Sequence, residues 1–507
     1  MSMGLTGTAW SLLPSLVAIL LALVTKDALL SLLAGVVVGG VLLGMPSPLA
    51  MLQAIVGDGS GNGLGLIGTI ADASNAGLLL FPVLIGIMLA LMERSGAAGS
   101  FGTWVTERVR TRQSSQLACS LLGCLLFVDD YFSCLVCGAV MRPVTQRTRV
   151  SRAKLAFLID ATAAPVCMIA PLSSWAAAVS ATATDLGGVS GLELFVRAIP
   201  YNFYSLLTLV FVFALALTGR DFGPMLSSER AAAGNTEAPA AKCDTNSVKH
   251  AGPLDFVLPI VLLVACCVPL MLWTGGFWNE GPAQGSLALA LGDTNTSFSL
   301  PAGTLLALAL SAMFLIARRS LHVTDLGPCI VEGARSMVPG VLTLVLALSL
   351  KAMTAALDAQ GFVFGLMSAA PNTLEALLPA LLFVVATGLA FATGTSWGTF
   401  AILIPIAIAV LGGASEATVA GIAACLAGAV CGDHASPLSD TTVMAATSAD
   451  VGLTEHVQTQ LPYVLLIAGV SLLCYVACGL GAPWLACMVA GGAALVAALL
   501  ALGRTVG

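Results

Sequence analysis

Long apolar runs are the feature of this sequence that most constrains its fold. Apolar windows of about 15 to 20 residues recur from Leu12 to Leu502, and a helix needs about 20 such residues to cross roughly 30 Å of hydrocarbon. Charged residues make up only 9% of the chain, whereas soluble domains carry roughly a quarter. Polar surface is therefore too scarce for a soluble fold, and we expect an all-α polytopic membrane protein.

Charge and cysteine usage exclude several classes of function. The net charge is −6 and no basic stripe extends beyond short loops, so nucleic acid is not an expected partner. Most of the 14 cysteines, for example Cys119, Cys266 and Cys474, lie in apolar runs without metal-ligand spacing. This distribution favours packing roles for the cysteines, and we expect no resident cofactor.

Hydropathy divides the chain into predicted spans separated by charged residues. These spans cover residues 12–24, 28–44, 76–92, 155–184, 198–218, 254–273, 301–317, 340–356, 417–450, 460–479 and 483–501. Two further stretches, 114–141 and 374–411, are apolar but are interrupted by the motifs FVDDYF (127–132) and TGTSWGT (393–399). Neither stretch fits a single crossing.

Basic residues indicate how these two interrupted stretches enter the membrane, because Lys and Arg are enriched in cytoplasmic loops. Both flanks of 114–141 are rich in arginine, whereas the flanks of 374–411 carry acidic residues and no Lys or Arg. A segment that begins and ends on one face is a re-entrant hairpin. We therefore predict one hairpin that opens to the cytoplasm and one that opens to the outside. The N-terminus is then outside and the C-terminus inside, and of the 20 Lys and Arg only Arg197 and Lys351 lie away from the cytoplasmic face.

A polar stretch divides the chain into two predicted halves, residues 1–218 and 254–507. Residues 219–253 lose apolar periodicity and gather Pro, Gly, Ser and charge, which is typical of a linker. We place this linker in the cytoplasm; a small regulatory element is the alternative interpretation.

The same order of features occurs in both halves. The features are the hairpins 114–141 and 374–411, each followed by a broken helix, 155–184 or 417–450. Within the broken helices, Pro171-Leu172-Ser173-Ser174 aligns with Pro437-Leu438-Ser439-Asp440. The charge pattern places the halves upside down relative to each other. Inverted repeats with broken helices near the midplane are the architecture of many secondary transporters.

Acidic residues lie inside the predicted hairpins and broken helices. They are Asp129 and Asp130 at the first hairpin tip, Asp160 in a helix, and Asp433 and Asp440 at the second break. A charged carboxylate at the bilayer centre costs at least ~2.5 kcal/mol, so such residues persist where they face a cavity or a partner. Adjacent carboxylates cannot both ionise cheaply there unless a cation neutralises them. If sodium and protons contend for one carboxylate, loading one ion releases the other.

We predict that sodium binds to four of these carboxylates, those of Asp129, Asp130, Asp433 and Asp440. Structural roles are the alternative interpretation. The hairpin pair could cap a helix or bridge to Arg142, and Asp160 could brace the neighbouring broken helix.

Hydroxyl groups accompany the acidic residues. The predicted ion- or substrate-binding set also contains Ser173, Ser174, Thr393, Thr395, Ser396, His434, Ser436, Ser439, Thr441 and Thr442. In the segment GDHASPLSDTT (432–442), side-chain oxygens and freed carbonyls could replace the hydration shell of a hard cation. His434 is interpreted either as a proton relay or as a satisfied structural group.

Several segments match the motifs of a known transporter family. They are FVDDYF followed by MRPVT, SRAKLAFLIDATAAPV, APLSSW, TGTSWGTF, and GDHASPLSDTT followed by EHVQTQLPY. At these residues the chain resembles the NhaC-type sodium/proton antiporter family, within a larger superfamily of inverted-repeat ion transporters. The resemblance implies cation-coupled antiport across a bacterial cytoplasmic membrane, an elevator-like motion and a homodimeric scaffold. That family includes sodium/proton exchangers, sodium-linked malate/lactate exchangers and candidate amino-acid carriers, so the cargo stays open.

Three functional hypotheses follow from these observations. The first is a secondary transporter that exchanges sodium for protons by alternating access. The second is a sodium- or proton-coupled carrier of a small carboxylate or amino acid, held by hydroxyls and helix N-termini. The third is a hydrolase that uses Ser436 or Ser439 with His434, but neither serine lies in a G-x-S-x-G elbow. We therefore expect a transporter rather than an enzyme, whose partners are membrane lipid, sodium, protons and, under the second hypothesis, an organic solute.

Overall fold

The computed structural model describes residues 6–506 except 26, 58–63, 183–188, 235–250, 282–283, 286–289, 291–292, 360–361, 363–371, 414 and 438. The elements of the first half are η1 (Ala9–Leu12), α1 (Leu13–Thr25), α2 (Ala28–Gly44), α3 (Pro48–Val56), α4 (Gly65–Ala71), α5 (Ala73–Arg94), α6 (Ala97–Arg108), α7 (Arg112–Leu125), α8 (Asp130–Arg147), α9 (Arg152–Cys167), α10 (Ser174–Thr182), α11 (Gly191–Ala198), η2 (Ile199–Tyr201) and α12 (Phe203–Thr218). Strand β1 (Arg220–Asp221) and helix α13 (Gly223–Gly234) follow.

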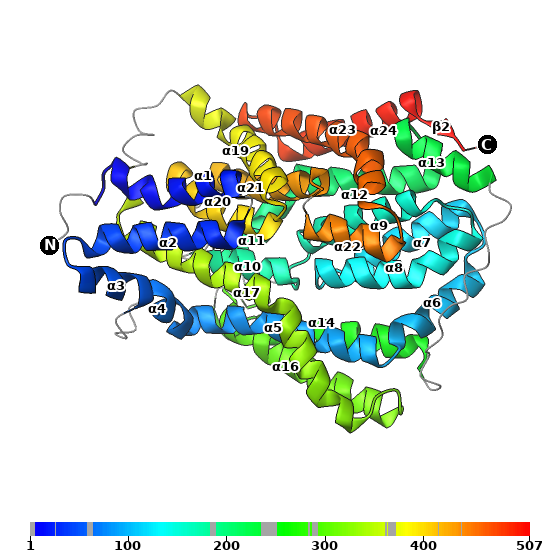
Figure 1. Ribbon diagram of the computed structural model, residues 1–507, viewed down its shortest axis with the longest axis horizontal. Helices are drawn as coiled ribbons and strands as arrows, with labels where there is room; N and C mark the ends of the chain where they lie inside the picture. The colour runs from blue at the N-terminus through cyan, green and yellow to red at the C-terminus, as the bar shows by residue number, and fades with distance from the viewer. Residues whose placement is uncertain are drawn as a thin grey trace.

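The second half contains the remaining elements (Figure 1). They are α14 (Pro253–Thr274), α16 (Thr296–Ala317), η3 (Val323–Asp325), α17 (Leu326–Ala356), α19 (Asn372–Thr393), α20 (Ser396–Leu411), α21 (Glu416–Ala435), α22 (Asp440–Ala449), α23 (Leu453–Gly479), α24 (Trp484–Leu502) and the short strand β2 (Arg504–Thr505). The prediction of an all-α polytopic protein is confirmed.

Seven helices within the described residues are long and apolar enough to cross a membrane. Two bent pairs of helices bring this number to nine if each pair is one span. One pair joins α11 and η2 to α12 at 51°, and the other is α17, which bends by 45° at Pro339. Proline removes one helical hydrogen bond and displaces the preceding turn, which explains the bend in α17.

The predicted hairpins and broken helices are present in both halves. Helices α7 and α8 form the first hairpin and α19 and α20 the second, while α9/α10 and α21/α22 are the broken helices. Figure 1 shows α7 and α8 toward one end of the long axis and α20 toward the other. The hairpins therefore approach the centre from opposite ends.

The packing of the helices repeats when the two halves are exchanged. Helix α9 packs against α7, α12 and α23, and α21 packs against α19, α23 and α12. After each break the chain crosses to the other half, because α22 packs on α8 and α10 packs on α20. Helices α5 and α17, one from each half, also pack together. This exchange of partners is the contact pattern of an inverted repeat.

Helices α9 and α21 form the centre of the molecule. All residues of α9 from Ala153 to Cys167 are buried, as are those of α21 from Thr418 to Ala435. A helix that is surrounded on all sides has no solvent or lipid face. Polar side chains on α9 and α21 must therefore find partners inside the protein.

Local sequence explains both breaks. Pro171 and Pro437 carry no backbone N–H, and the residue before a proline is driven out of the helical region. Two residues later, Ser173 accepts a hydrogen bond from the backbone N–H of Ala176 (3.1 Å). Ser439 accepts one from the N–H of Thr442 (3.2 Å). The two serines restart the helices as N-terminal caps at equivalent positions of the repeat.

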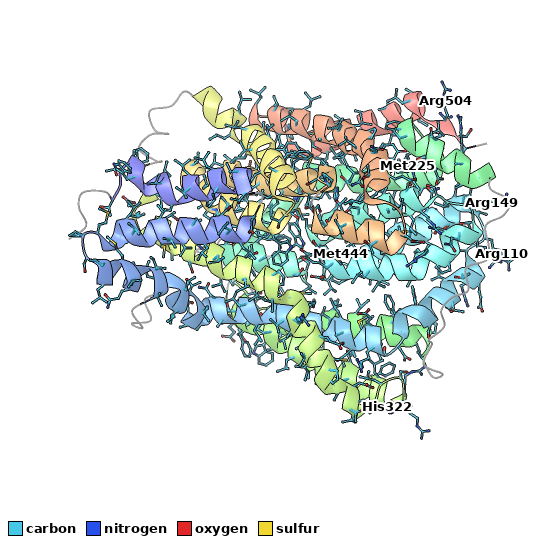
Figure 2. All side chains as sticks on the ribbon, viewed as in Figure 1. Arg110, Arg149, Met225, His322, Met444 and Arg504 are labelled. Atoms are coloured by element: carbon cyan, nitrogen blue, oxygen red, sulfur yellow. The ribbon has the colours of Figure 1, made fainter. Side chains whose placement is uncertain are left out.

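The beginning of the predicted linker is folded against the end of the molecule that carries basic side chains. Figure 2 shows Arg110, Arg149 and Arg504 at this same end. Strand β1 pairs with β2 in antiparallel register, and α13 packs on α9 and α23. Residues 235–250 of the linker lie outside the described part of the chain.

Two buried ion pairs fix β1 and α13 to the transmembrane helices. The ammonium of Lys154 on α9 contacts the carboxylate of Asp221 at 2.5 Å, and both side chains are almost fully buried. The Tyr463 hydroxyl donates to the same carboxylate (2.7 Å). On α13, Glu229 pairs with Arg112 and accepts from the backbone N–H of Ser151 (2.7 Å), the residue that caps α9. The linker therefore holds the N-terminus of α9 in place.

Candidate functional site

The tip of the first hairpin places two acidic residues inside the protein. Asp129 and Asp130 lie at the start of α8 and are only 1% and 0% exposed. The Trp175 indole N–H donates to the Asp130 carboxylate (3.1 Å), and the backbone N–H of Ser174 donates to the carbonyl of Val128 (2.8 Å). The first break is thus joined to the first hairpin tip by side-chain and backbone hydrogen bonds.

A second carboxylate site lies midway along α9. One oxygen of Asp160 accepts hydrogen bonds from the Thr442 hydroxyl (3.1 Å) and from the Gln460 amide (3.0 Å). The imidazole of His456 lies 3.5 Å from the same oxygen. Asp160 therefore joins α9 to α22 and α23, whose bonding residues lie 282 and 300 positions later in the sequence.

The end of α21 supplies the third group of polar side chains. Asp433 accepts a hydrogen bond from the Thr441 hydroxyl (2.7 Å), which is also 3.1 Å from the hydroxyl of Ser439. His434 lies 3.1 Å from the Tyr204 hydroxyl through Nδ1, and its carbonyl accepts from Gln460 (2.6 Å). These bonds close the second break around a buried carboxylate.

The carboxylates of the two repeats face one region of the interior. Asp130 interacts electrostatically with Asp129 and also with Asp433 from the other half. Cys134, one turn after the hairpin tip, contacts the carbonyl of Thr441 through its thiol (3.9 Å), and the Thr441 hydroxyl is bonded to Asp433. Buried carboxylates repel one another and lose hydration, so their proximity favours uptake of positive charge. We call Asp129, Asp130 and Asp433 the carboxylate cluster.

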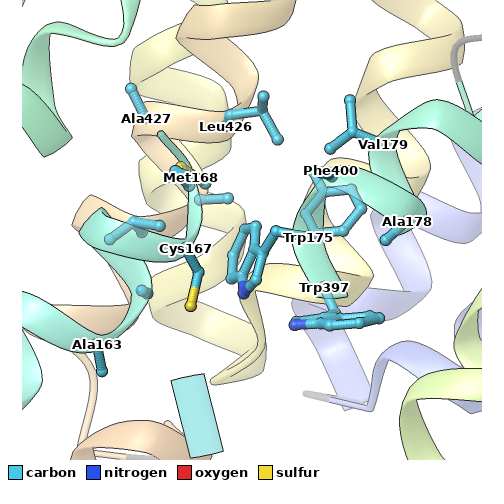
Figure 3. Packing of buried hydrophobic residues seen from close by; sticks show 14 of the residues in the cluster. Ala163, Cys167, Met168, Trp175, Ala178, Val179, Trp397, Phe400, Leu426 and Ala427 are labelled. Carbon is cyan, nitrogen blue, oxygen red and sulfur yellow. The ribbon is translucent and has the colours of Figure 1, made fainter. Parts of the chain in front are cut away.

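Aromatic rings connect the carboxylate cluster to the second hairpin tip, and we call Trp175, Trp397 and Phe400 the aromatic wall. The Trp175 ring packs edge-on against Trp397 at 5.9 Å and lies 5.2 Å from the ring of Phe400. Figure 3 shows Trp175 at the centre of this packing, beside Cys167 and Met168. The two tips are therefore joined through aromatic rings from opposite repeats.

Many of the predicted hydroxyls are used by the local backbone. The hydroxyl of Ser173 donates to the Cys167 carbonyl (2.6 Å), and that of Ser436 donates to the Phe391 carbonyl (2.8 Å). Thr393 donates to a carbonyl of its own helix, and Thr395 caps α20 by accepting from Gly398 (3.3 Å). These groups shape the breaks and turns, which leaves their carbonyls and lone pairs as the oxygens available to a ligand.

Other predicted residues are not used in this way. Ser396 is 3% exposed, and the buried Ser174 hydroxyl makes no hydrogen bond within the described residues. Asp440 starts α22, but its side chain lies outside the described part of the structure. Within the described residues, no group of three or more His, Cys, Asp or Glu side chains forms a ligand set for a metal. The predicted sodium site therefore depends on hydroxyl and carbonyl oxygens as well as carboxylates.

The sequence interpretation missed three polar partners of the site, namely His456 and Gln460 on α23 and Tyr204 on α12. All three are buried. His456 and Gln460 are one helical turn apart in the polar segment TEHVQTQ that begins α23, so their i and i+4 spacing was the available signal. Tyr204 gave no comparable pattern, because its partner His434 is 230 positions away.

A family comparison covers more than half of the chain. The model described as "Na+/H+ antiporter family" matches residues 180–480. The match includes the second hairpin, the second broken helix and α23, and it ends directly after α23.

Two curated relatives differ in how much of the chain they cover. A Haemophilus influenzae protein, described only as uncharacterized, is 32% identical over 98% of this chain and 96% of its own length. The malate-2H(+)/Na(+)-lactate antiporter of Bacillus subtilis is 37% identical, over 30% of this chain and 32% of that protein.

A solved structure has the same fold. The YdaH transporter of Alcanivorax borkumensis superposes with a TM-score of 0.58 at 17% identity, over 83% of this chain and 88% of that one. At this identity the likeness concerns the fold alone.

Proposed function

The chain belongs to the Na+/H+ antiporter family of secondary transporters, and we propose that it exchanges sodium for protons by alternating access. The observation that carries the proposal is the carboxylate cluster, in which buried acidic side chains from both inverted repeats interact. Such a cluster is stabilised when it takes up sodium or protons and is costly when it is empty. The two ions would therefore replace each other.

The arrangement of the breaks supports alternating access. Two members of the cluster lie at the first hairpin tip, which is hydrogen-bonded to α10, and the third lies at the end of α21; each of these elements has a chain break beside it. Broken helices allow one part of a repeat to move against the other around a fixed site. In the proposed cycle, the loaded cluster is exposed to one side of a bacterial cytoplasmic membrane and then to the other.

Sodium-driven proton movement in proteoliposomes tests the proposal. The vesicles are acidic inside and contain a dye whose fluorescence is quenched at low pH. When sodium is added outside, without any organic solute, protons should leave and the dye fluorescence should recover, a response called dequenching. Asp433→Asn should abolish this response, because it removes one charge of the cluster but keeps the side-chain shape. Glu107→Gln, at an exposed carboxylate on α6, is the matched control and should respond as the wild type. If the wild-type protein gives no sodium-driven dequenching, the proposal is wrong.

The second candidate is a sodium- or proton-coupled carrier of a small carboxylate or amino acid. The similarity to the malate-2H(+)/Na(+)-lactate antiporter favours it, together with the helix N-termini at both breaks, which attract carboxylates. A thermal-shift screen of hydroxy acids, dicarboxylates and amino acids, with and without sodium, separates the candidates. Stabilisation by one solute only in the presence of sodium would favour the carrier, and stabilisation by sodium alone favours exchange.

A further inference from the structure

A histidine on α23 is buried beside Asp160 without a complete set of partners. His456 is 0% exposed, and its Nε2 lies 3.5 Å from Asp160 Oδ2. This distance exceeds the usual 2.7–3.2 Å of a hydrogen bond. Within the described residues, neither ring nitrogen of His456 makes a hydrogen bond. An unsatisfied buried polar group costs about 1–3 kcal/mol, so its presence calls for an additional partner.

Asp160 offers an acceptor on the other side of this gap. Its Oδ2 accepts from Thr442 and Gln460, both of which are neutral donors. Its Oδ1 is buried and has no hydrogen-bond partner within the described residues. The carboxylate is thus held in place by neutral donors, and among the described residues no Lys or Arg forms an ion pair with it. A mobile proton on the imidazole would supply the missing charge and donor.

The groups that face this pair come from several elements. Cys134 on α8 and Tyr204 on α12 interact electrostatically with Asp160. His434 on α21 interacts with both Asp160 and His456. Helix α22 contributes Thr442, and α24 carries no charged residue. The side chains of Asp440 on α22 and Glu375 on α19 lie outside the described part of the structure. On α13, Glu229 is already paired with Arg112. Among the side chains that the structure describes, Asp160 is therefore the carboxylate within ion-pair distance of His456.

We propose that His456 and Asp160 form a proton-binding pair that is separate from the carboxylate cluster. This inference rests on the proposed sodium/proton exchange. When loaded, the imidazole carries a proton taken from water and forms an ion pair with Asp160. When the proton returns to water, His456 becomes neutral, and Thr442 and Gln460 continue to hold the Asp160 carboxylate.

Hydrogen bonds connect this pair to the cluster. Thr442 lies within 3.1 Å of Asp160 and within 3.3 Å of the Asp433 carbonyl, and Gln460 bonds both Asp160 and the His434 carbonyl. Neutralising Asp160 changes the field at the end of α21, where Asp433 belongs to the cluster. Proton uptake at His456 can therefore be coupled to sodium binding without a shared ligand.

The test compares His456→Gln with His322→Gln in purified full-length protein and in proteoliposomes. His322 is exposed and lies at the beginning of η3, so its variant is the matched control. Two quantities are measured: the rate of sodium-driven dequenching from pH 5 to 8, the range in which imidazoles change charge, and the sodium concentration that gives half-maximal thermal stabilisation at pH 8.

We expect His456→Gln to lower the exchange rate at least tenfold and to flatten its dependence on pH. Half-maximal stabilisation by sodium should remain within threefold of the wild-type concentration, because the cluster is intact. A purely structural histidine would change folding and sodium binding together. His456→Asn replaces the variant if His456→Gln does not fold.

Two results would overturn the inference. The first is exchange by His456→Gln at the wild-type rate with the wild-type pH profile. The second is simultaneous loss of sodium stabilisation and exchange in a folded variant, which would place His456 in the sodium site itself. A wild type without sodium-driven exchange would instead remove the proposed function, so the two failures are distinguishable.

Discussion

At the residue scale, neutral hydrogen-bond donors hold the buried carboxylates of the site. Trp175 donates to Asp130, Thr441 donates to Asp433, and Thr442 and Gln460 donate to Asp160. A hydrogen bond to a charged group contributes roughly 1.5–3 kcal/mol. Such donors stabilise an ionised carboxylate, and because they are neutral they add no positive charge of their own.

The indole of Trp175 provides a residue-scale prediction. Trp175→Phe removes the donor to Asp130 but keeps an aromatic ring against Phe400. The ionised Asp130 becomes less stable, so sodium should bind about tenfold more weakly, which corresponds to about 1.4 kcal/mol. The sodium concentration for half-maximal thermal stabilisation measures this change.

Trp397→Phe is the matched control for Trp175→Phe. The Trp397 indole is packed against Trp175, but its N–H makes no hydrogen bond within the described residues. Its variant should bind sodium like the wild type. Equal weakening by both variants would mean that the aromatic wall, rather than the hydrogen bond, sets the affinity.

Some site residues could be predicted from the sequence because they are charged or polar within apolar runs. Asp129, Asp130, Asp160 and Asp433 are acidic positions in apolar runs, and all four are buried in the interior. The hydroxyls of Ser173 and Thr395 gave the same kind of signal, yet they cap helices. A serine that caps and a serine that binds an ion look alike in a sequence, because both stand beside a helix break.

At the element scale, the hairpins and broken helices were predictable because their causes are local. Proline and a capping serine mark both helix breaks, and Gly394 adopts the left-handed conformation at the turn of the second hairpin (φ 69°). The first hairpin tip, FVDDYF, contains none of these residues and is marked by its acidic pair. The contribution of α23 was not predictable in the same way. Gln460 meets Asp160 across 300 positions, and only the packing of α23 on α9 and α21 brings them together.

The attachment of β1 to α9 provides an element-scale prediction. Asp221→Asn leaves the ammonium of Lys154 buried without its countercharge, and removing one partner of a buried ion pair costs about 3–5 kcal/mol. The apparent Tm of the purified protein should fall clearly. The double variant Lys154→Met/Asp221→Asn should recover part of this loss, because the uncompensated charge is removed.

An exposed ion pair serves as the control for this prediction. Arg152 and Asp450 lie 2.8 Å apart with about half of each side chain exposed. Exposed pairs contribute roughly 0–1 kcal/mol, so Asp450→Asn should leave the apparent Tm almost unchanged. A similar Tm loss in both single variants would mean that the Lys154–Asp221 pair does not anchor the linker.

At the scale of the whole molecule, the two repeats exchange partners across the centre. Helix α22 of the second half packs on α8 of the first, and α10 packs on α20. Each hairpin therefore packs against the broken helix of the opposite repeat, while its tip is hydrogen-bonded to the broken helix of its own repeat. This arrangement makes the site a property of both halves, so neither half alone would contain the complete carboxylate cluster.

The orientation proposed from the basic loops can be tested on intact cells. Arg504→Cys lies at the basic end of the molecule and Glu280→Cys lies in the loop after α14; both positions are exposed. With the C-terminus inside, a membrane-impermeant maleimide should label Glu280→Cys in intact cells and Arg504→Cys only after permeabilisation. The reverse pattern would contradict the proposed orientation.

The central claim is that sodium and protons replace each other at buried acidic groups. Proton release on sodium binding measures this replacement directly, in purified protein in weakly buffered solution near neutral pH with a pH-indicator dye. We predict that sodium releases protons from the wild type, that potassium at equal concentration does not, and that Asp433→Asn reduces the release. Sodium binding without proton release, or equal release by potassium, would contradict the account.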